Sequence, residues 1–159
     1  MSDPNQWGTG RPAHYFQRAM SELGGQKFQQ EFAHPVLVHH GEPTNALAIQ
    51  QTAEAVIFVH AVRLAADQEQ VSLGRLETND IFLPHPTISG VHAWLRPSAS
   101  LEEWQVLDNG SRNGTFVDDE SVLVDDAAAL EDGVALRIGS LNLTWLSAEM
   151  FSFFLRNYS

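Results

Sequence analysis

Short apolar runs separated by turn residues make up most of the chain after Pro35. The runs are rich in Val, Ile, Leu and Trp, and Gly, Pro, Asn and Asp lie between them. This spacing is typical of an all-β sandwich or barrel and does not fit alternating strands and helices. The expected strands are 36–40, 55–62, 71–75, 80–83, 91–96, 103–108, 114–117, 121–124, 134–139 and 141–146.

Helical periodicity appears only near the two ends of the chain. After Pro12, apolar residues recur at helical spacing as far as Leu23, and Gly24-Gly25 ends the run. A second short helix is expected over QKFQQEF, before Pro35. The first eleven residues are polar and carry Pro and Gly, so we expect them to be disordered.

The last segment, SAEMFSFFLRNY, begins with a Ser-x-Glu pattern that can cap a helix. We expect Met150, Phe153 and Phe154 to pack back on the sandwich. The pattern thus divides the chain into a partly helical N-terminal extension (1–34), a β-sandwich (35–147) and a C-terminal helix packed on it (148–159).

Composition narrows the classes of function. At 159 residues the chain fits one domain with a real core. The net charge of −11 repels nucleic acid and anionic membranes, so binding of an anion must rest on a few locally placed arginines. The absence of cysteine excludes disulfides and thiolate chemistry. Without an apolar run long enough to span a membrane or a signal-peptide pattern, we expect a cytoplasmic protein.

The stretch LDNGSRNGTFV (107–117) places two Asn-Gly pairs around Ser111 and Arg112. Asn and Gly both accept positive φ, so either pair can form a hairpin turn. Asn113 offers an amide that both donates and accepts hydrogen bonds, which suits contact with a peptide main chain. A plain hairpin remains the alternative interpretation of this loop.

Two further clusters combine turn residues with side chains that bind phosphate. Arg75 follows Gly74 at the end of an expected strand, where a guanidinium can hold an oxyanion through two hydrogen bonds. Ser89 can donate to a phosphate oxygen, and His92 can support its loop. Taken singly, each cluster also fits a solvated arginine, an ordinary turn serine or a core histidine.

Five motifs in order resemble the forkhead-associated (FHA) domain over residues 35–147. They are GR (74–75), ND (79–80), SxxH (89–92), DxxSxNGTxV (108–117) and LxDGxxLxIG (130–139). The resemblance implies an FHA-like antiparallel β-sandwich that binds phosphothreonine in an extended peptide through the loops at one end. The N-terminal extension and the final helix lie outside it.

The resemblance also implies roles for individual residues. Arg75 and Ser89 match the family's phosphate contacts, and Asn113 matches the residue that holds the peptide backbone. The expected phosphopeptide-binding set is Arg75, Ser89, Gly90, Ser111, Arg112 and Asn113. The expected supporting set is Gly74, Asn79, Asp80, His92, Gly114 and Thr115.

Two departures from the family pattern fall within this set. Arg112 stands where many members carry Thr or another small residue that touches the phosphate, so it either adds a second cation or points to solvent. Gly90 stands where the family often has a longer side chain that helps hold the peptide, and its absence predicts looser recognition.

We therefore expect a phosphothreonine-dependent adaptor in Ser/Thr kinase signalling, with no catalytic activity, metal or cofactor. Its expected partner is a phosphothreonine-containing protein, either a kinase or a kinase substrate. The first alternative is an FHA-like scaffold that binds unphosphorylated protein. A cupin-like metal enzyme using His39, His40, His60 and Glu42 is the least favoured, because neighbours on a strand point to opposite faces. The sequence leaves the oligomeric state open.

Overall fold

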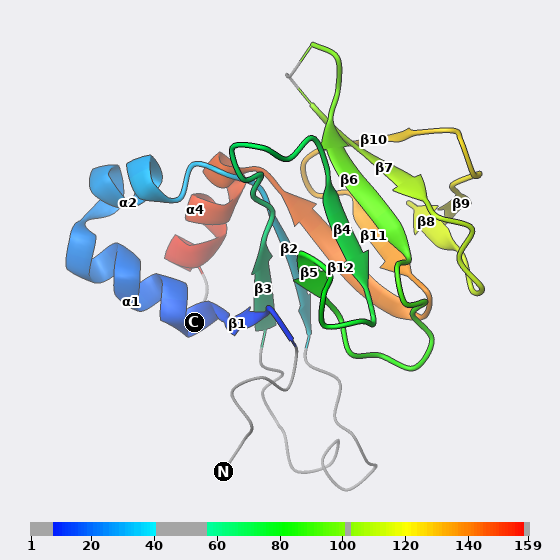
Figure 1. Cartoon of the computed structure of the whole chain (residues 1–159). Coiled ribbons are helices and arrows are strands. Elements are labelled where there is room, and N and C mark those ends of the chain that lie inside the picture. Colours follow the sequence, from blue (N-terminus) through cyan, green and yellow to red (C-terminus); the bar gives the residue numbers. More distant parts are fainter. Residues whose placement is uncertain (1–7, 41–56, 101–102, 158–159) are drawn as a thin grey trace, which may run out of the picture.

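Two β-sheets pack face to face, and helices gather at one side of them (Figure 1). The computed structural model describes residues 8–40, 57–100 and 103–157. All the expected strands except part of 55–62 fall within these ranges. The architecture confirms the predicted β-sandwich with helices at both ends of the chain.

The larger sheet has seven strands, and each hydrogen-bonded pair in it is antiparallel. Its spatial order is β1-β3-β2-β12-β11-β8-β9. The strands are β1 (Arg11–Pro12), β3 (Ile57–Ala61), β2 (Val36–His40), β12 (Leu141–Leu146), β11 (Ala135–Ile138), β8 (Thr115–Val117) and β9 (Glu120–Ser121).

The smaller sheet has five strands in the order β10-β7-β6-β4-β5. They are β10 (Ala128–Leu130), β7 (Trp104–Asp108), β6 (Ala93–Pro97), β4 (Val71–Gly74) and β5 (Ile81–Phe82). The β4–β5 pair is parallel and the other pairs are antiparallel.

In the described ranges, the helices are α1 (Ala13–Leu23), α2 (Gly25–Glu31) and α4 (Ala148–Asn157). Gly24 separates the first two, with a φ of 86° and an N–H that donates to the Met20 carbonyl. Glycine reaches this backbone conformation without a steric penalty, which explains why the helical run ends there. In the described part of the chain, no helix is both long enough and apolar enough to cross a membrane.

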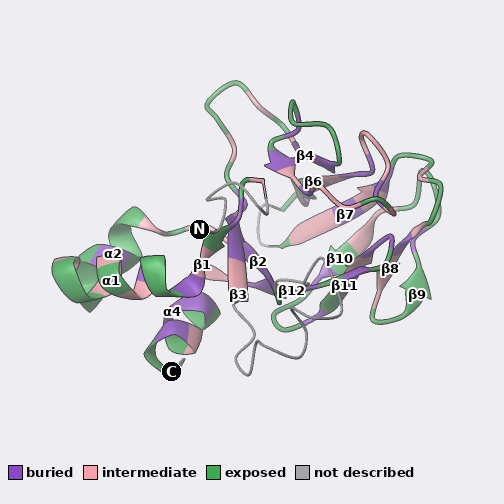
Figure 2. Cartoon of the chain, turned by 90° about the horizontal axis from the view of Figure 1, so that it is seen from below, coloured by how far each residue is buried: buried purple, intermediate pink, exposed green. Residues whose placement is uncertain are grey.

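The described residues form two hydrophobic clusters. One fills the sandwich, and the other lies between the helices and the outer face of β2 and β3. Phe16, Phe28 and Phe151 form the centre of the second cluster, where the rings of Phe16 and Phe151 meet edge to face at 5.3 Å. Figure 2 shows the buried faces of the helices turned toward the sheet.

The C-terminal helix packs in a different register from the one predicted. Phe151 and Leu155 are its buried apolar residues, whereas Met150 and Phe153 are 39% and 55% exposed. Phe154 is partly buried against the cluster. Positions 151 and 155 lie one helical turn apart and face the aromatic rings of α1 and α2.

The prediction of disorder for the first eleven residues is wrong for residues 8–11. Thr9 exchanges hydrogen bonds with Phe82 of β5, through its backbone N–H and its side-chain oxygen. Arg11 then pairs with Val59 of β3. This segment links the edges of the two sheets, which the sequence pattern did not reveal. Residues 1–7 lie outside the described residues.

Of the expected strand 121–124, only Ser121 lies in a strand, where it ends β9. Leu123 and Val124 are 63% and 55% exposed in the connection that follows. The next strand, β10, begins at Ala128 and was not predicted, because alanine carries little strand preference.

Candidate functional site

Three connections meet at one end of the sandwich: residues 75–80 after β4, 83–92 between β5 and β6, and 109–114 between β7 and β8. Ser89 lies where they join. Its carbonyl accepts the Arg75 N–H at 3.0 Å, and its hydroxyl oxygen accepts the Arg112 N–H at 3.0 Å. Residues distant in sequence thus form one surface.

Arg75 is exposed at the exit of β4, and its guanidinium has a defined orientation. Its Nε donates to the Ile88 carbonyl at 2.9 Å. Within the described residues, the structure gives no partner to its two terminal nitrogens. A guanidinium held in this way can offer two parallel N–H groups to an oxyanion.

The Ser89 hydroxyl is oriented by its neighbour across the loop. Because its oxygen accepts the Arg112 N–H, its own hydrogen remains able to donate. Ser89 is half-buried, whereas the Arg112 side chain is exposed. The predicted phosphate ligands Arg75 and Ser89 therefore lie side by side, with Arg112 next to them.

A close approach of two backbones holds the first two connections together. A Cβ added at Gly74 would lie 2.0 Å from the Gly90 carbonyl oxygen. The Asn79 side-chain amide donates to that same oxygen at 2.7 Å and to the Leu76 carbonyl at 2.8 Å. Asp80 anchors the end of the first connection by accepting the Ser72 N–H at 3.0 Å.

His92 is fully buried beneath the second connection. Its Nδ1 accepts the Ser89 N–H at 3.0 Å, so Nε2 carries the proton and donates to the Gly114 carbonyl at 2.8 Å. The ring thus joins the loops that carry Ser89 and Asn113. Removal from water lowers the pKa of His92 and keeps the ring neutral.

This arrangement predicts a pH dependence of stability. Because the folded pKa of His92 lies below 6.5, the unfolded chain binds a proton first as the pH falls. The stability contributed by the neutral ring is therefore present above about pH 6.5 and is lost on acidification. Between about pH 7.5 and about pH 5.5, the free energy of unfolding measured by denaturant should fall less in His92→Gln than in the wild type.

The same comparison controls for two other histidines whose pKa values are lowered. His34 and His60 also have lowered pKa values, caused first by burial, and they are present in both proteins. Equal losses of unfolding free energy in the two proteins would contradict the role given to His92.

Asp108 organises the third connection. Its carboxylate accepts the Ser111 N–H at 2.9 Å, the Ser111 hydroxyl, and the Thr115 hydroxyl at 2.7 Å. Burial alone would raise the pKa of Asp108, but the hydrogen bonds from Ser111 and Thr115 outweigh it and lower that pKa. Asp108 stands in the quoted motif, yet sequence reasoning gave it no role.

Of the residues expected to bind peptide, Ser111 faces its own loop. Its hydroxyl donates to Asp108 and accepts the Gly114 N–H at 3.0 Å, so it shapes the turn. Asn113 is exposed and donates one amide hydrogen to the Thr87 carbonyl at 2.7 Å, a contact that does not use its side-chain oxygen. Thr87, a further residue that sequence reasoning missed, also accepts the Ser140 N–H through its hydroxyl.

The Leu76 side chain lies next to the space that a side chain at position 90 would enter. A Cβ at Gly90 would meet the Leu76 side chain at 3.2 Å. Leu76 is 51% exposed and directly follows Arg75. An apolar surface therefore lies beside the candidate phosphate ligands, and nothing local in the sequence indicates it.

The histidines of the cupin-like alternative pack against each other. His39 and His60 are buried, with their Nε2 atoms hydrogen-bonded at 2.9 Å, and His40 is exposed. Glu42 lies outside the described residues. Among the residues that the structure describes, no group of three or more His, Cys, Asp or Glu side chains is placed to hold a metal ion.

Comparison with known proteins agrees with this geometry. The family model "FHA domain" matches residues 71–139. The glycogen accumulation regulator GarA of Mycolicibacterium smegmatis is 41% identical over 85 residues, which cover 54% of this chain and 51% of that protein. The oxoglutarate dehydrogenase inhibitor of Corynebacterium jeikeium is 35% identical over 85 residues, covering 54% and 56%. The chain thus spans about half the length of these curated relatives.

Solved structures show the same fold. A domain studied for phosphothreonine-dependent FHA interactions superposes with a TM-score of 0.50 at 19% identity, covering 70% of this chain and 95% of that one. EmbR of Mycobacterium tuberculosis, solved with a low-affinity phosphopeptide, gives a TM-score of 0.51 at 20% identity, covering 82% and 31%. Residues 71–139, which carry the three converging loops, thus match the FHA domain family.

Proposed function

We propose that this protein binds phosphothreonine within an extended peptide segment, through the loop end that carries Arg75 and Ser89. The observation that supports the proposal is the junction at residues 88–89, where the Ile88 carbonyl accepts the Arg75 Nε–H and the Ser89 hydroxyl accepts the Arg112 N–H. In this proposal Arg75 and Ser89 hold the phosphate, and Asn113 contacts the peptide backbone. Gly74, Asn79, His92, Gly114 and Thr115 hold the loops in place.

Electrostatics makes a local cationic site necessary. A phosphothreonine carries about −1.5 to −2 charges near neutral pH, and the whole chain carries −11. Hydrogen bonds to charged groups contribute roughly 1.5–3 kcal/mol each. Contacts from Arg75, Ser89 and Arg112 can thus supply much of the ~8 kcal/mol of a micromolar complex.

The chemistry of the site is recognition rather than catalysis. We infer that the protein acts as an adaptor in Ser/Thr kinase signalling in the cytoplasm. Its partner is a phosphothreonine-containing protein, either a kinase or a kinase substrate. The matched relatives include a regulator and an enzyme inhibitor by name, which supports a regulatory role.

Fluorescence polarisation with degenerate peptide pools tests the proposal. Phosphothreonine, phosphoserine and unphosphorylated pools of the same design are titrated at low and high salt. We expect saturable binding of the phosphothreonine pool alone, weakened by salt. Equal binding of all pools would instead support the alternative of a scaffold for unphosphorylated proteins, and absence of binding would also contradict the proposal.

The exposed Leu76 predicts a preference for an apolar residue near the phosphothreonine. Covering half of a leucine side chain stabilises a complex by about 1 kcal/mol, or about fivefold in affinity. Leu76→Ala should therefore weaken binding of peptides with a large apolar neighbour and leave alanine-flanked peptides unchanged. Leu123→Ala, at an exposed leucine elsewhere, is the control. The same loss for both peptide types would contradict this role.

A further inference from the structure

A pocket lies at the opposite end of the sandwich from the candidate phosphopeptide site. It has a volume of about 420 Å³ and is lined by Pro35, Glu103, Trp104, Leu130, Glu131, Asp132, Trp145 and Ser147. Trp104 begins β7, whereas Asp108 ends that strand beneath the phosphopeptide loops. A strand of this length spans roughly 15 Å, so the pocket is a separate surface.

Two tryptophans form the apolar part of this pocket. The Trp104 and Trp145 rings have centroids 5.9 Å apart and planes tilted by 48°. Trp145 is 3% exposed and belongs to the sandwich core, and Trp104 is partly buried against it. The electron-rich faces of indole rings attract cations more strongly than those of other aromatic side chains.

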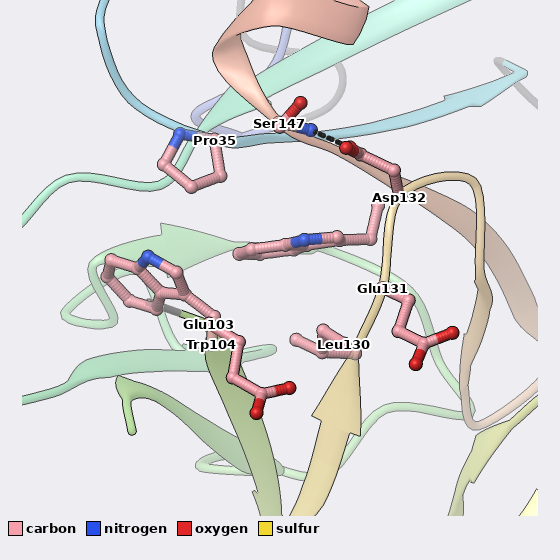
Figure 3. A pocket seen from close by; sticks show the side chains of 8 residues that line it. Pro35, Glu103, Trp104, Leu130, Glu131, Asp132 and Ser147 are labelled. Carbon is pink, nitrogen blue, oxygen red and sulfur yellow. Dashed lines mark hydrogen bonds between the residues drawn. The ribbon is translucent and has the colours of Figure 1, made fainter. Parts of the chain in front are cut away.

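Three acidic side chains, from Glu103, Glu131 and Asp132, line the same pocket. Trp104 pairs with Leu130 at the end of the β7–β10 ladder; Glu103 comes just before Trp104 and Glu131 just after Leu130. Figure 3 shows these two glutamates on either side of Leu130. Within the described part of the chain, the structure shows no hydrogen bond or ion pair for either carboxylate, and no lysine or arginine lines the pocket.

Asp132 has a different role at the same rim. Its carboxylate accepts the Ser147 N–H, next to the start of α4, which fixes its position (Figure 3). The rim therefore combines one anchored carboxylate with two glutamates that lie just beyond the ends of the paired strands β7 and β10. Like charges gathered at one rim repel each other, and a bound cation relieves that repulsion.

We propose that this pocket binds a lysine or arginine side chain of a protein partner. The indole rings suit the cation and its apolar stem, and the glutamates neutralise its charge. The carboxylates disfavour an anionic ligand, and no described cluster of three or more His, Cys, Asp or Glu side chains is placed to hold a metal ion. This pocket gives the protein a contact with a basic segment that is independent of phosphothreonine binding.

Indole N–H signals in ¹H–¹⁵N NMR spectra test the proposal on the full chain. The probes are acetyl-Gly-Lys-Gly-amide and acetyl-Gly-Arg-Gly-amide, with acetyl-Gly-norleucine-Gly-amide as the uncharged control. We expect the basic peptides to shift the Trp104 and Trp145 signals saturably, with a Kd on the order of 1 mM that rises with salt. The Trp94 signal, from a residue outside the pocket, should not move.

Two charge-removing variants test the role of the carboxylates at the rim. Glu131→Gln should weaken binding about two- to fivefold, because one exposed carboxylate is lost. Glu120→Gln removes the same charge from β9, outside the pocket, and should have no effect. Equal shifts with the norleucine peptide, absence of saturable shifts, or unchanged binding by Glu131→Gln would each overturn the proposal.

Discussion

Replacing Arg75 with alanine should weaken binding of a phosphothreonine peptide by about 100-fold or more. Two charge-assisted hydrogen bonds to the phosphate account for at least about 3 kcal/mol. The guanidinium also holds the Ile88 carbonyl through Nε, so its loss loosens the loop that carries Ser89. Arg75→Lys keeps the charge but loses the two-pronged geometry, and we expect it to restore only part of the affinity.

The measurement is isothermal titration with one phosphopeptide, accompanied by circular dichroism and thermal unfolding of each variant. Arg96→Ala is the matched control, because Arg96 is an exposed arginine on β6 and its removal changes the net charge equally. We expect Arg96→Ala to bind normally. Undiminished affinity of Arg75→Ala would contradict the central role proposed for Arg75 in the site.

Gly74→Ala should be the most destabilising single change at the loop end. The added Cβ would lie 2.0 Å from the Gly90 carbonyl oxygen and 2.7 Å from the Asn79 amide nitrogen. The Asn79 amide normally donates to the Gly90 carbonyl and so holds the backbone next to Ser89. Relief of the clash must break this hydrogen bond. Overpacking and the lost hydrogen bonds together predict a loss of about 3 kcal/mol or more.

Chemical denaturation of Gly74→Ala and Gly25→Ala provides the test. A Cβ at Gly25 meets nothing within 4 Å, and this glycine begins α2, so we expect the control to be neutral or stabilising. A Gly74→Ala protein as stable as the wild type would show that the two loops do not need this close approach.

The β-sandwich was predictable because the longer strands carry their own signal. Turn residues bound the apolar runs, and the larger strands, such as β2 and β12, fall where their Val, Leu and Trp residues indicated. The missed strands β1 and β10 are short and contain Arg, Pro, Ala and Leu, so their pairing is set by neighbouring strands. The burial of Phe151 instead of Phe153 depends on the rings of the N-terminal helices, which no local pattern shows.

The candidate site was predictable only in part. The motifs around Arg75, Ser89 and Asn113 carry residue types suited to phosphate and peptide, and the structure brings these residues to one end. The contact between Leu76 and Gly90 needs two loops to fold together. Likewise, Trp104 and Trp145 come from different sheets, so their shared pocket has no sequence signal.

The most direct test of phosphothreonine recognition is chemical-shift mapping of the ¹⁵N-labelled protein with a matched pair of peptides. One peptide carries phosphothreonine and the other carries threonine at the same position. We predict saturable shifts of the Arg75, Ser89, Arg112 and Asn113 backbone amides with the phosphorylated peptide alone. Shifts confined to other surfaces, or equal shifts with both peptides, would contradict the proposed site.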